Sequence, residues 1–261
     1  MRYLRLYLNF IRFSFSRAME FRVDFFFRVV MDCVFYATNL IFFHILFDHI
    51  EGLGGLGLDE IYVFVAGYLF ADAVTMTIFA NNMWWLPQLI NRGDLDYYLV
   101  RPVSSLFFVS LREFAANSFL NLIIAGGILG WALLRHPGDL GLGVMTIHVG
   151  LLLVGVFINW MVNLMFTLPV FWLHSNTGLR QLFLSLEVFG ERPHRIYRGW
   201  VGRLLLSVLP LACIVSLPTF ILFEGPSAET VWPMVLVPPL LFLVVQITWR
   251  RGLKSYASAS S

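Results

Sequence analysis

The side chains of this sequence that could carry chemistry lie inside long apolar stretches. Asp72 is in the middle of the apolar segment from 60 to 81, with no basic residue three or four positions away. An ionisable group costs several kcal/mol at the centre of a bilayer unless it has a partner or water. Asp72 is therefore expected either to hydrogen-bond to another helix or to face a polar conduit. Arg28 and Asp32, which are four positions apart, can instead pair with each other.

Two pairs of asparagines are the other polar groups at this depth. Asn117 with Asn121, and Asn159 with Asn163, have the four-residue spacing that places both side chains on one face of a helix. Amide side chains on facing helices can hydrogen-bond across the gap between them. We expect an amide ladder between these two helices. The four asparagines and Asp72 are the candidate lining of a pathway.

No constellation of catalytic residues accompanies these groups. The chain has one lysine, Lys254, in the context Gly-Leu-Lys-Ser, so it lacks the phosphate-binding loop that ends in Gly-Lys-Ser or Gly-Lys-Thr. The six histidines show no metal-ligand spacing such as His-Glu-x-x-His. We therefore expect a chain that is not an enzyme and that has neither a cofactor of its own nor a metal site.

The composition identifies the kind of element that must position these groups. Of 261 residues, 59% are apolar and 13% are charged, against roughly 45–50% and about 25% in soluble domains. Such an excess comes from repeated apolar runs that are long enough to cross a bilayer. It predicts an all-α integral membrane protein and excludes disorder. The net charge of +2 is small and spread along the chain, which argues against a nucleic-acid partner.

Apolar runs that are each long enough to cross about 30 Å of hydrocarbon, at about 1.5 Å per residue, occur six times. They cover residues 25–47, 60–81, 107–134, 144–173, 204–223 and 231–249. The runs are continuous rather than alternating, so the strands of a β-barrel are excluded. We expect a single transmembrane domain over residues 1–261, with six membrane helices.

The distribution of basic residues predicts the orientation, because Arg and Lys near membrane spans are retained in the cytoplasm. Nearly all of them fall before the first span, between the second and third, between the fourth and fifth, and after the last. They are Arg2, Arg5, Arg12, Arg17, Arg22, Arg92, Arg101, Arg180, Arg192, Arg195, Arg198, Arg203, Arg250, Arg251 and Lys254. The other three connections hold only Arg135. Both termini are therefore expected in the cytoplasm.

Residues 1–24 are expected to form an amphipathic helix. Polar side chains recur every three or four positions, as in Arg5, Asn9 and Arg12, while apolar ones such as Leu8 fall on the other side. Such a helix lies in the interface of the inner leaflet, with its arginines near anionic lipid headgroups. A helix packed against protein in the cytosol is the alternative.

The connector between the second and third spans, residues 81–105, has the most informative pattern. A short helix reaches a turn at Gly93, and a second turn places Leu95, Tyr98 and Leu99 on one face. An apolar and aromatic face in the cytosol needs a partner to cover it. A helix that lies on the membrane surface is the alternative.

Several motifs make the sequence resemble a known family. The connector reads Arg92-Gly-Asp-Leu-Asp-Tyr-Tyr-Leu-Val-Arg-Pro-Val-Ser, and much later come Glu191-Arg-Pro-His-Arg-Ile-Tyr and Leu209-Pro-Leu. Together with the span count, they resemble the membrane subunits of type-2 ABC exporters, in particular a bacterial branch of permeases of similar length. The resemblance implies a multi-pass protein of the bacterial cytoplasmic (inner) membrane.

The same resemblance implies partners and a contact site. The chain would be one permease half that pairs with a second, identical or related, half and with two cytosolic ATPase subunits, which carry ATP and Mg. By position, the connector is similar to the coupling helix of the family, which sits in a cleft on the ATPase. The residues implied in that contact are Arg92, Gly93, Asp94, Leu95, Asp96, Tyr97, Tyr98, Leu99, Arg101 and Pro102.

ATP-driven export is the function that the resemblance implies, with two six-helix bundles that rock to open a path outward. The alternative is a non-transporting membrane scaffold that relays ATPase motion to an envelope assembly. The sequence departs from the family pattern at the outer side. Described members have two short re-entrant helices between the last two spans, whereas only a short loop separates 204–223 from 231–249 here. A simpler outer gate is therefore expected.

Overall fold

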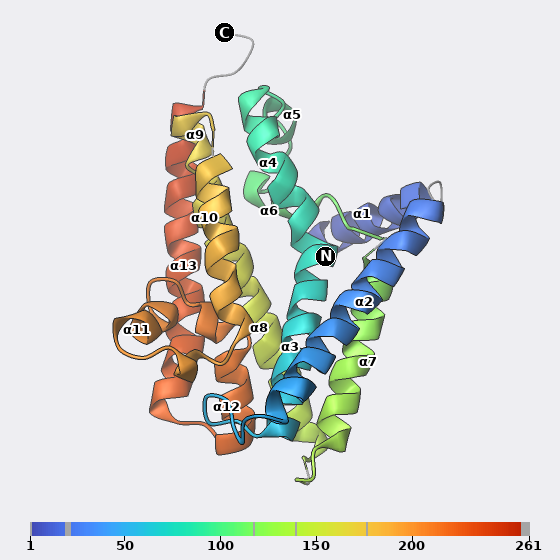
Figure 1. The fold of residues 1–261 in the computed structure, drawn as a ribbon. Helices are drawn as coiled ribbons and strands as arrows, with labels where there is room; N and C mark the ends of the chain where they lie inside the picture. The colour runs from blue at the N-terminus through green and yellow to red at the C-terminus, as the bar shows by residue number, and fades with distance from the viewer. Residues whose placement is uncertain (1, 19–21, 117, 139, 176, 257–261) are drawn as a thin grey trace.

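The computed structural model describes residues 2–18, 22–116, 118–138, 140–175 and 177–256, and its regular elements within these ranges are helices (Figure 1). Four helices in the described residues are long and apolar enough to cross a membrane. They are Val29–Phe47, Leu58–Asn91, Leu142–Leu173 and Ala228–Ser255. The expected all-α membrane fold is confirmed at this level. These four helices correspond to the expected spans at 25–47, 60–81, 144–173 and 231–249.

The elements follow one another without any domain-sized insertion in the described ranges. In chain order they are α1 Arg2–Ala18, α2 Arg22–Phe47, α3 Leu58–Thr75, η1 Met76–Ala80, α4 Asn81–Asn91, α5 Asp96–Leu99, α6 Ser105–Leu111, α7 Phe119–Arg135, α8 Leu142–Thr167, α9 Val170–Leu173, α10 Thr177–Glu187, η2 Val188–Glu191, η3 His194–Ile196, α11 Trp200–Leu206, η4 Leu211–Cys213, α12 Ser216–Glu224 and α13 Ala228–Ser255. Helix α3, the π-helical turn η1 and helix α4 are continuous, so they form one long helical column.

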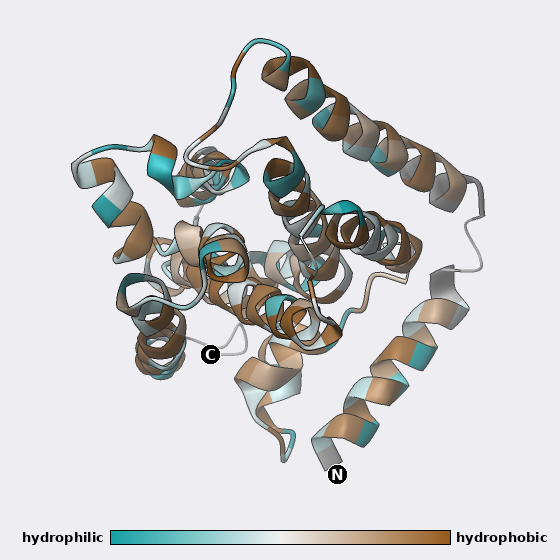
Figure 2. Cartoon of the chain, turned by 90° about the horizontal axis from the view of Figure 1, so that it is seen from below, coloured by the Kyte–Doolittle hydropathy of each residue, from teal (hydrophilic) through white to brown (hydrophobic). Residues whose placement is uncertain are grey.

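Helix α1 lies beside the bundle and contacts it through one side. Tyr3 and Phe10 pack edge-on against Phe107 and Phe108 of α6, with ring centroids 4.8 and 5.1 Å apart. Other apolar side chains of α1, Leu8 among them, are exposed. In Figure 2, α1 runs along the edge of the molecule beside the N label, with hydrophilic and hydrophobic residues alternating along its turns. The helix therefore packs on protein and also leaves an apolar surface uncovered.

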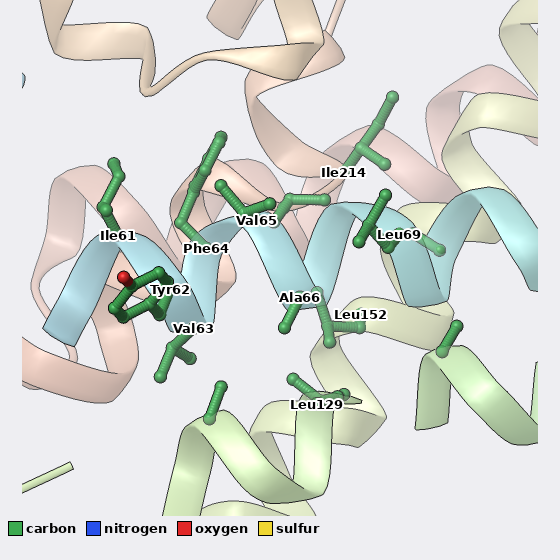
Figure 3. Packing of buried hydrophobic residues seen from close by; sticks show 14 of the residues in the cluster. Ile61, Tyr62, Val63, Phe64, Val65, Ala66, Leu69, Leu129, Leu152 and Ile214 are labelled. Atoms are coloured by element: carbon green, nitrogen blue, oxygen red, sulfur yellow. The ribbon is translucent and has the colours of Figure 1, made fainter. Parts of the chain in front are cut away.

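Helix α3 is the centre of the fold. It contacts α2, α7, α8 and α12, and it is apolar on every side, which is typical of a helix buried on all sides. Figure 3 shows its side chains, Ile61 to Leu69, among Leu129 of α7, Leu152 of α8 and Ile214. Of these α3 side chains, Ile61, Phe64 and Leu69 are fully buried. Burial of this kind contributes about 1.5–3 kcal/mol for each large apolar side chain.

The expected span at 107–134 is wrong as one continuous helix. Helix α6 ends at Leu111 and α7 begins at Phe119, and the described residues between them, 112–116 and Ser118, have irregular backbone. Irregular backbone at membrane depth is tolerated only where its polar groups find partners in protein or water. Asn82 supplies two of them, because its Oδ1 accepts from the Glu113 amide and its Nδ2 donates to the Glu113 carbonyl, both at 2.9 Å.

The π-helical turn at 76–80 supplies further partners. The Ala115 amide donates to the carbonyl of Thr77 at 2.8 Å. The Thr77 hydroxyl donates to the carbonyl of Ser118 at 3.2 Å. A π-turn interrupts the regular ladder of helical hydrogen bonds, and such turns are rare and frequent at functional sites. The wide turn in the long column and the break between α6 and α7 thus form one junction.

Replacing Asn82 with leucine is expected to lower the free energy of unfolding by about 2–4 kcal/mol, because the amide and the carbonyl of Glu113 would both lose their partners. Asn82 is buried, whereas its neighbour Asn81 is exposed. Asn81→Leu is therefore the matched control. Thermal unfolding of the detergent-solubilised protein measures the difference. Equal melting temperatures of the two variants would contradict the role given to Asn82.

Helix α10 follows a route that the sequence did not suggest. It packs along α8, and it begins beside α4 at the end of the bundle that holds the connector (Figure 1). There the guanidinium carbon of Arg180 lies 3.5 Å from the ring centroid of Trp84. The side chain of Asn91 donates to the carbonyl of His174 at 2.6 Å, just before α10 begins.

The residues after α10 reach the opposite end of the bundle. At the end of η2, Glu191 accepts a hydrogen bond from the hydroxyl of Tyr68 in α3 at 3.2 Å. Pro193 and Ile196 then lie against Gly54 in the loop between α2 and α3. A β-carbon on Gly54 would be 3.1 Å from Pro193 and 3.3 Å from Ile196. The segment from α10 to η3 therefore passes from one end of the bundle to the other.

Polar contacts fix this segment to both ends of α12. The Arg195 guanidinium donates to both carboxylate oxygens of Glu224, at 2.5 and 2.6 Å, and these bonds lower the pKa of Glu224. Beside it, burial lowers the pKa of His194 to about 4. The His194 ring is therefore neutral at pH 7 and lies 2.7 Å from the hydroxyl of Ser216.

The expected span at 204–223 is therefore wrong. These residues form the end of α11, then η4 and α12, with irregular backbone between them. The chain leaves α11 before Pro210, which has no amide hydrogen to continue a helix, and Pro218 falls in the first turn of α12, where proline is tolerated. Arg192 and Arg195 consequently lie near the loop between α2 and α3 and not beside the connector, as the basic-residue count suggested.

Candidate functional site

The connector has a defined shape around Gly93. The φ of this residue is 79°, in the left-handed region that side chains with a β-carbon rarely adopt. The amide of Arg92 donates to the carbonyl of Gln88 at 2.9 Å, and the amide of Leu95 donates to the carbonyl of Leu89 at 3.3 Å. These bonds end α4 and direct α5 toward α6.

One side of α5 is held against α6. Leu95 is 0% exposed. The centroids of the Tyr98 and Phe108 rings are 5.0 Å apart. The guanidinium carbon of Arg112 lies over the Tyr98 ring, 5.0 Å from its centroid. The Tyr98 hydroxyl also accepts a hydrogen bond from Arg112. Leu95 and Tyr98 therefore secure the connector to the bundle. They do not form an exposed apolar face together with Leu99, which differs from the expectation.

The opposite side of α5 is exposed. Tyr97 is 71% exposed and Val100 is 84% exposed, and Leu99 is 38% exposed. Of the other residues implied in the ATPase contact, the exposed ones are Arg92, Arg101 and Pro102. The half-buried ones are Gly93, Asp94 and Asp96. The outward surface of the connector thus consists of Tyr97, Leu99 and Val100 with basic residues around them.

The C-terminal end of α13 lies at the same end of the molecule as the connector (Figure 1). The indole of Trp249 donates to the hydroxyl of Ser105, at the start of α6, at 3.2 Å. The indole of Trp172 in α9 donates to the hydroxyl of Ser255 at 2.9 Å. These contacts tie the connector, α9 and the last helix into one end of the bundle.

A cavity of about 550 Å³ is lined by residues of α2, α3, α7 and α10. Four carboxylates line it, from four elements: Asp32 of α2, Asp72 of α3, Glu187 of α10 and Glu191 of η2. None of the lining residues that the structure describes is basic. The side chain of Arg28, expected to pair with Asp32, lies outside the described residues. The sequence indicated Asp72 as a candidate, but it did not indicate the two glutamates.

The three described asparagines, Asn121, Asn159 and Asn163, do not form the expected ladder between the third and fourth spans. Asn121 of α7 donates its amide to the carboxylate of Asp32. Asn159 of α8 donates to Glu187 Oε1 at 3.2 Å. The reason is that α3 contacts both α7 and α8 and separates their amides. The oxygens of both Asn121 and Asn159 are buried and have no hydrogen-bond partner among the described residues.

The remaining two asparagines contribute less to this cavity. Asn163 accepts a hydrogen bond from the hydroxyl of Thr167 at 3.3 Å. It lines a neighbouring cavity of about 70 Å³ that also includes Asp72 and Arg180. Asn117 lies outside the described residues.

Asp72 stands in the wall of both cavities. Within the described part of the chain its carboxylate has neither a hydrogen bond nor an ion pair. It is close enough to Glu187, Asp32 and Glu191 for like-charge repulsion. Two positions were expected for Asp72. Among the described residues, the structure shows no hydrogen bond from Asp72 to another helix. It places the side chain at a polar cavity instead.

Glu187 and Glu191 were missed because the link between the fourth and fifth expected spans was placed in the cytoplasm. One signal could have found Glu187. It follows the apolar sequence Leu182-Phe-Leu-Ser-Leu and precedes Val188-Phe189, which is the environment of a carboxylate on a mostly apolar helix. Among the described residues, no group of three or more His, Cys, Asp or Glu side chains is arranged to hold a metal ion.

Comparison with known proteins places this architecture in a family. The model of one family, described as ABC-2 family transporter protein, matches residues 33–260. No curated protein and no solved structure matches the chain. The matched region includes the connector, the helices from α3 to α13 and most of the cavity lining, whereas Phe27, Met31 and Asp32 precede it. The chain therefore belongs to the ABC-2 family of transporter proteins, the membrane-spanning components of ABC transporters.

Proposed function

We propose that this chain is the membrane-spanning permease subunit of an ATP-driven exporter. It forms the translocation path with a second permease, identical or related, and it is coupled to a dimer of cytosolic ABC ATPases that bind ATP and Mg. Membership of the ABC-2 family implies ATPase partners in general. The observation that carries the proposal is the connector, which presents Tyr97, Leu99 and Val100 on a secured turn at one end of the bundle.

The implied contact residues divide into two roles in this proposal. Leu95, which is fully buried, and Tyr98, which packs on Phe108 of α6, give the connector its shape. Tyr97 and Val100 enter the cleft of the ATPase, since apolar and aromatic anchors supply most of the binding energy of such interfaces. The exposed Arg92 and Arg101 lie at the rim, where charges affect association rate and specificity.

One helical column links the connector to the cavity. Residues Leu58–Asn91 form a continuous helix, with Asp72 in the cavity wall and Asn91 at the connector. A displacement of the connector by the ATPase therefore moves a wall of the cavity. This is the physical basis for alternating access, in which a rigid-body movement opens the path to one side at a time.

The proposal places the connector and both chain ends in the cytoplasm of a bacterium, with the protein in the cytoplasmic (inner) membrane. Six crossings follow, made by α2, by α3 with α4, by α6 with α7, by α8, by α10 with η2, and by α13. Helices α11 and α12 then turn back on the outer side, as the family resemblance implies, so a simpler outer gate is not proposed. Basic residues near the connector favour this orientation: Arg92, Arg101, Arg180, Arg250, Arg251 and Lys254.

Cysteine labelling is expected to separate this topology from the one suggested by hydropathy. In a background that lacks Cys33 and Cys213, a cysteine at Arg198 should react with a membrane-impermeant thiol reagent in intact cells. A cysteine at Arg92 should react only after the membrane is opened. Both positions are exposed, so a difference reports the side of the membrane. If position 198 is not labelled in intact cells, the segment before α11 lies in the cytoplasm and the proposed topology is wrong.

Export itself is tested with the purified complex in liposomes. We expect an ABC ATPase from the same cell to co-purify with this chain, and a transported substrate to stimulate its ATP turnover and to accumulate on the far side of the membrane. A membrane scaffold would bind the ATPase and permit ATP turnover without accumulation of any substrate. Failure of every co-expressed ABC ATPase to bind would contradict the proposal.

A further inference from the structure

We propose that the cavity between α2, α3 and α10 binds an organic cation, and that such cations are the class of substrate moved by the exporter. The export step rests on the proposed function above. The binding site rests on residues of this chain alone.

The charge of the cavity is the first argument. Asp32, Asp72, Glu187 and Glu191 line it, and its described lining includes no basic residue. Carboxylates in a low-dielectric interior are costly unless a partner compensates them. Tyr68 donates a single hydrogen bond to Glu191, and Asn159 donates one to Glu187. These neutral donors do not neutralise the negative charge of the two glutamates and Asp72. A cation that enters the cavity would do so.

A buried acceptor without a donor is the second and independent argument. Asn121 is 4% exposed and lines the cavity. Its nitrogen donates to Asp32, while its oxygen is buried and has no partner among the described residues. A buried polar atom of this kind is costly unless a ligand or water satisfies it. The Asn121 oxygen and the carboxylates of Asp72, Glu187 and Glu191 thus give the cavity acceptors that a protonated amine can satisfy.

The apolar part of the wall indicates the size of the cation. Phe27, Met31, Phe35 and Tyr36 of α2 form one side of the cavity. Aromatic faces attract cations, and apolar side chains bind the body of an organic ion. A cavity of about 550 Å³ falls in the range of about 300–1,000 Å³ that accommodates drug-sized ligands. A metal ion or a free ammonium ion would leave most of this space empty.

Two ions of the same shape and opposite charge test the inference. Tetraphenylphosphonium and tetraphenylborate carry four phenyl groups around one central atom and differ in the sign of their charge. Equilibrium dialysis against the solubilised wild-type chain, with a detergent-only compartment to subtract micelle partitioning, measures the binding of each. We expect saturable binding of the phosphonium and none of the borate. This comparison needs no variant, so a folding defect cannot obscure it.

Charge removal at the cavity is the second arm. The triple variant with Asp72→Asn, Glu187→Gln and Glu191→Gln keeps side-chain size and is expected to bind tetraphenylphosphonium at least about tenfold more weakly, because the attraction between opposite charges is lost. Asp59→Asn is the matched control. It removes a carboxylate from the same helix α3 at the far end, where Asp59 lies 3.7 Å from Arg135, and it should bind like the wild type. Melting temperatures of all three proteins verify that they are folded.

The outcomes separate this inference from the proposed function. Equal binding of the two ions, or unchanged phosphonium affinity in the folded triple variant, overturns the cation site. Displacement of the phosphonium by Mg²⁺, but not by choline at matched ionic strength, would assign the carboxylates to an inorganic ion and overturn it as well. ATPase co-purification is measured on the same samples, and its loss in the wild type would contradict the proposed function instead.

Discussion

Complexes that carry alanine at both Tyr97 and Val100 are expected to lose about tenfold or more of their co-purifying ATPase. These side chains project away from the bundle, being 71% and 84% exposed. Anchors of this kind often contribute about 1–4 kcal/mol each to an interface, and about 1.4 kcal/mol already corresponds to a factor of ten. Since neither residue is part of the buried core, insertion and folding of the permease should be unchanged.

Exposed side chains at and after α11 supply a matched control for this experiment. Trp200 and Val208 are each 71% exposed, and they lie near α11, away from the connector (Figure 1). Alanine at both positions removes a similar exposed pair and should leave the ATPase bound. Tyr98→Ala tests the second role, because it removes the packing on Phe108 and should lower the melting temperature. If the double variant at Tyr97 and Val100 retains the wild-type amount of ATPase, the connector is not the docking element.

The second large effect is expected at Gly155, where alanine should destabilise the protein by about 3 kcal/mol. A β-carbon there would be 2.7 Å from the Cα and the carbonyl carbon of Ile214, and closer still to its carbonyl oxygen. Backbone cannot move aside as a flexible side chain can, so the cost lies at the upper end for overpacking. Either α8 or the segment from η4 to α12 must shift.

Gly150→Ala is the control for this substitution. Gly150 lies in the same helix α8, and a β-carbon there would meet nothing within 4 Å, so alanine should be neutral or slightly stabilising. Thermal unfolding compares the two variants. Thiol labelling of the buried Cys213, in a Cys33→Ser background, should accelerate in Gly155→Ala only. Identical behaviour of the two variants would mean that η4 does not pack on α8.

Hydropathy predicted the four uninterrupted helices because each is apolar along most of its length. It could not predict the break between α6 and α7, because the partners of that irregular backbone, Asn82 and Thr77, belong to a different helix. It also passed over α10. This helix has 11 residues, and Thr177, Arg180 and Gln181 interrupt its apolar pattern near the N-terminal end. The contact of Arg180 with Trp84 and the position of Glu187 at the cavity depend on tertiary structure.

The candidate site was predictable in place but not in orientation. Helical spacing predicted that Leu95, Tyr98 and Leu99 share one apolar face, but it cannot tell which side of a turn faces solvent. In the structure Leu95 is buried, Tyr98 is half-buried and Leu99 is exposed. That is decided by α6 and by Arg112, which contacts Tyr98. The sequence indicated the acidic cavity only through Asp72 and Asn121, since the Asp32 carboxylate was expected to pair with Arg28. Its other carboxylates come from segments distant in sequence, so their approach follows from the packing of α2, α3 and α10.

The length of the helical column sets the height at which the connector stands above the lipid. At about 1.5 Å per residue, the 34 residues of Leu58–Asn91 span about 50 Å, whereas the hydrocarbon layer is about 30 Å thick. Trp84 and Trp85 are exposed, and exposed tryptophans of membrane helices mark the headgroup layer. Asn91 lies six residues further along the chain, about 9 Å beyond that layer. The connector that follows Asn91 therefore stands clear of the hydrocarbon layer, so water or a protein partner, and not lipid tails, covers Tyr97 and Val100.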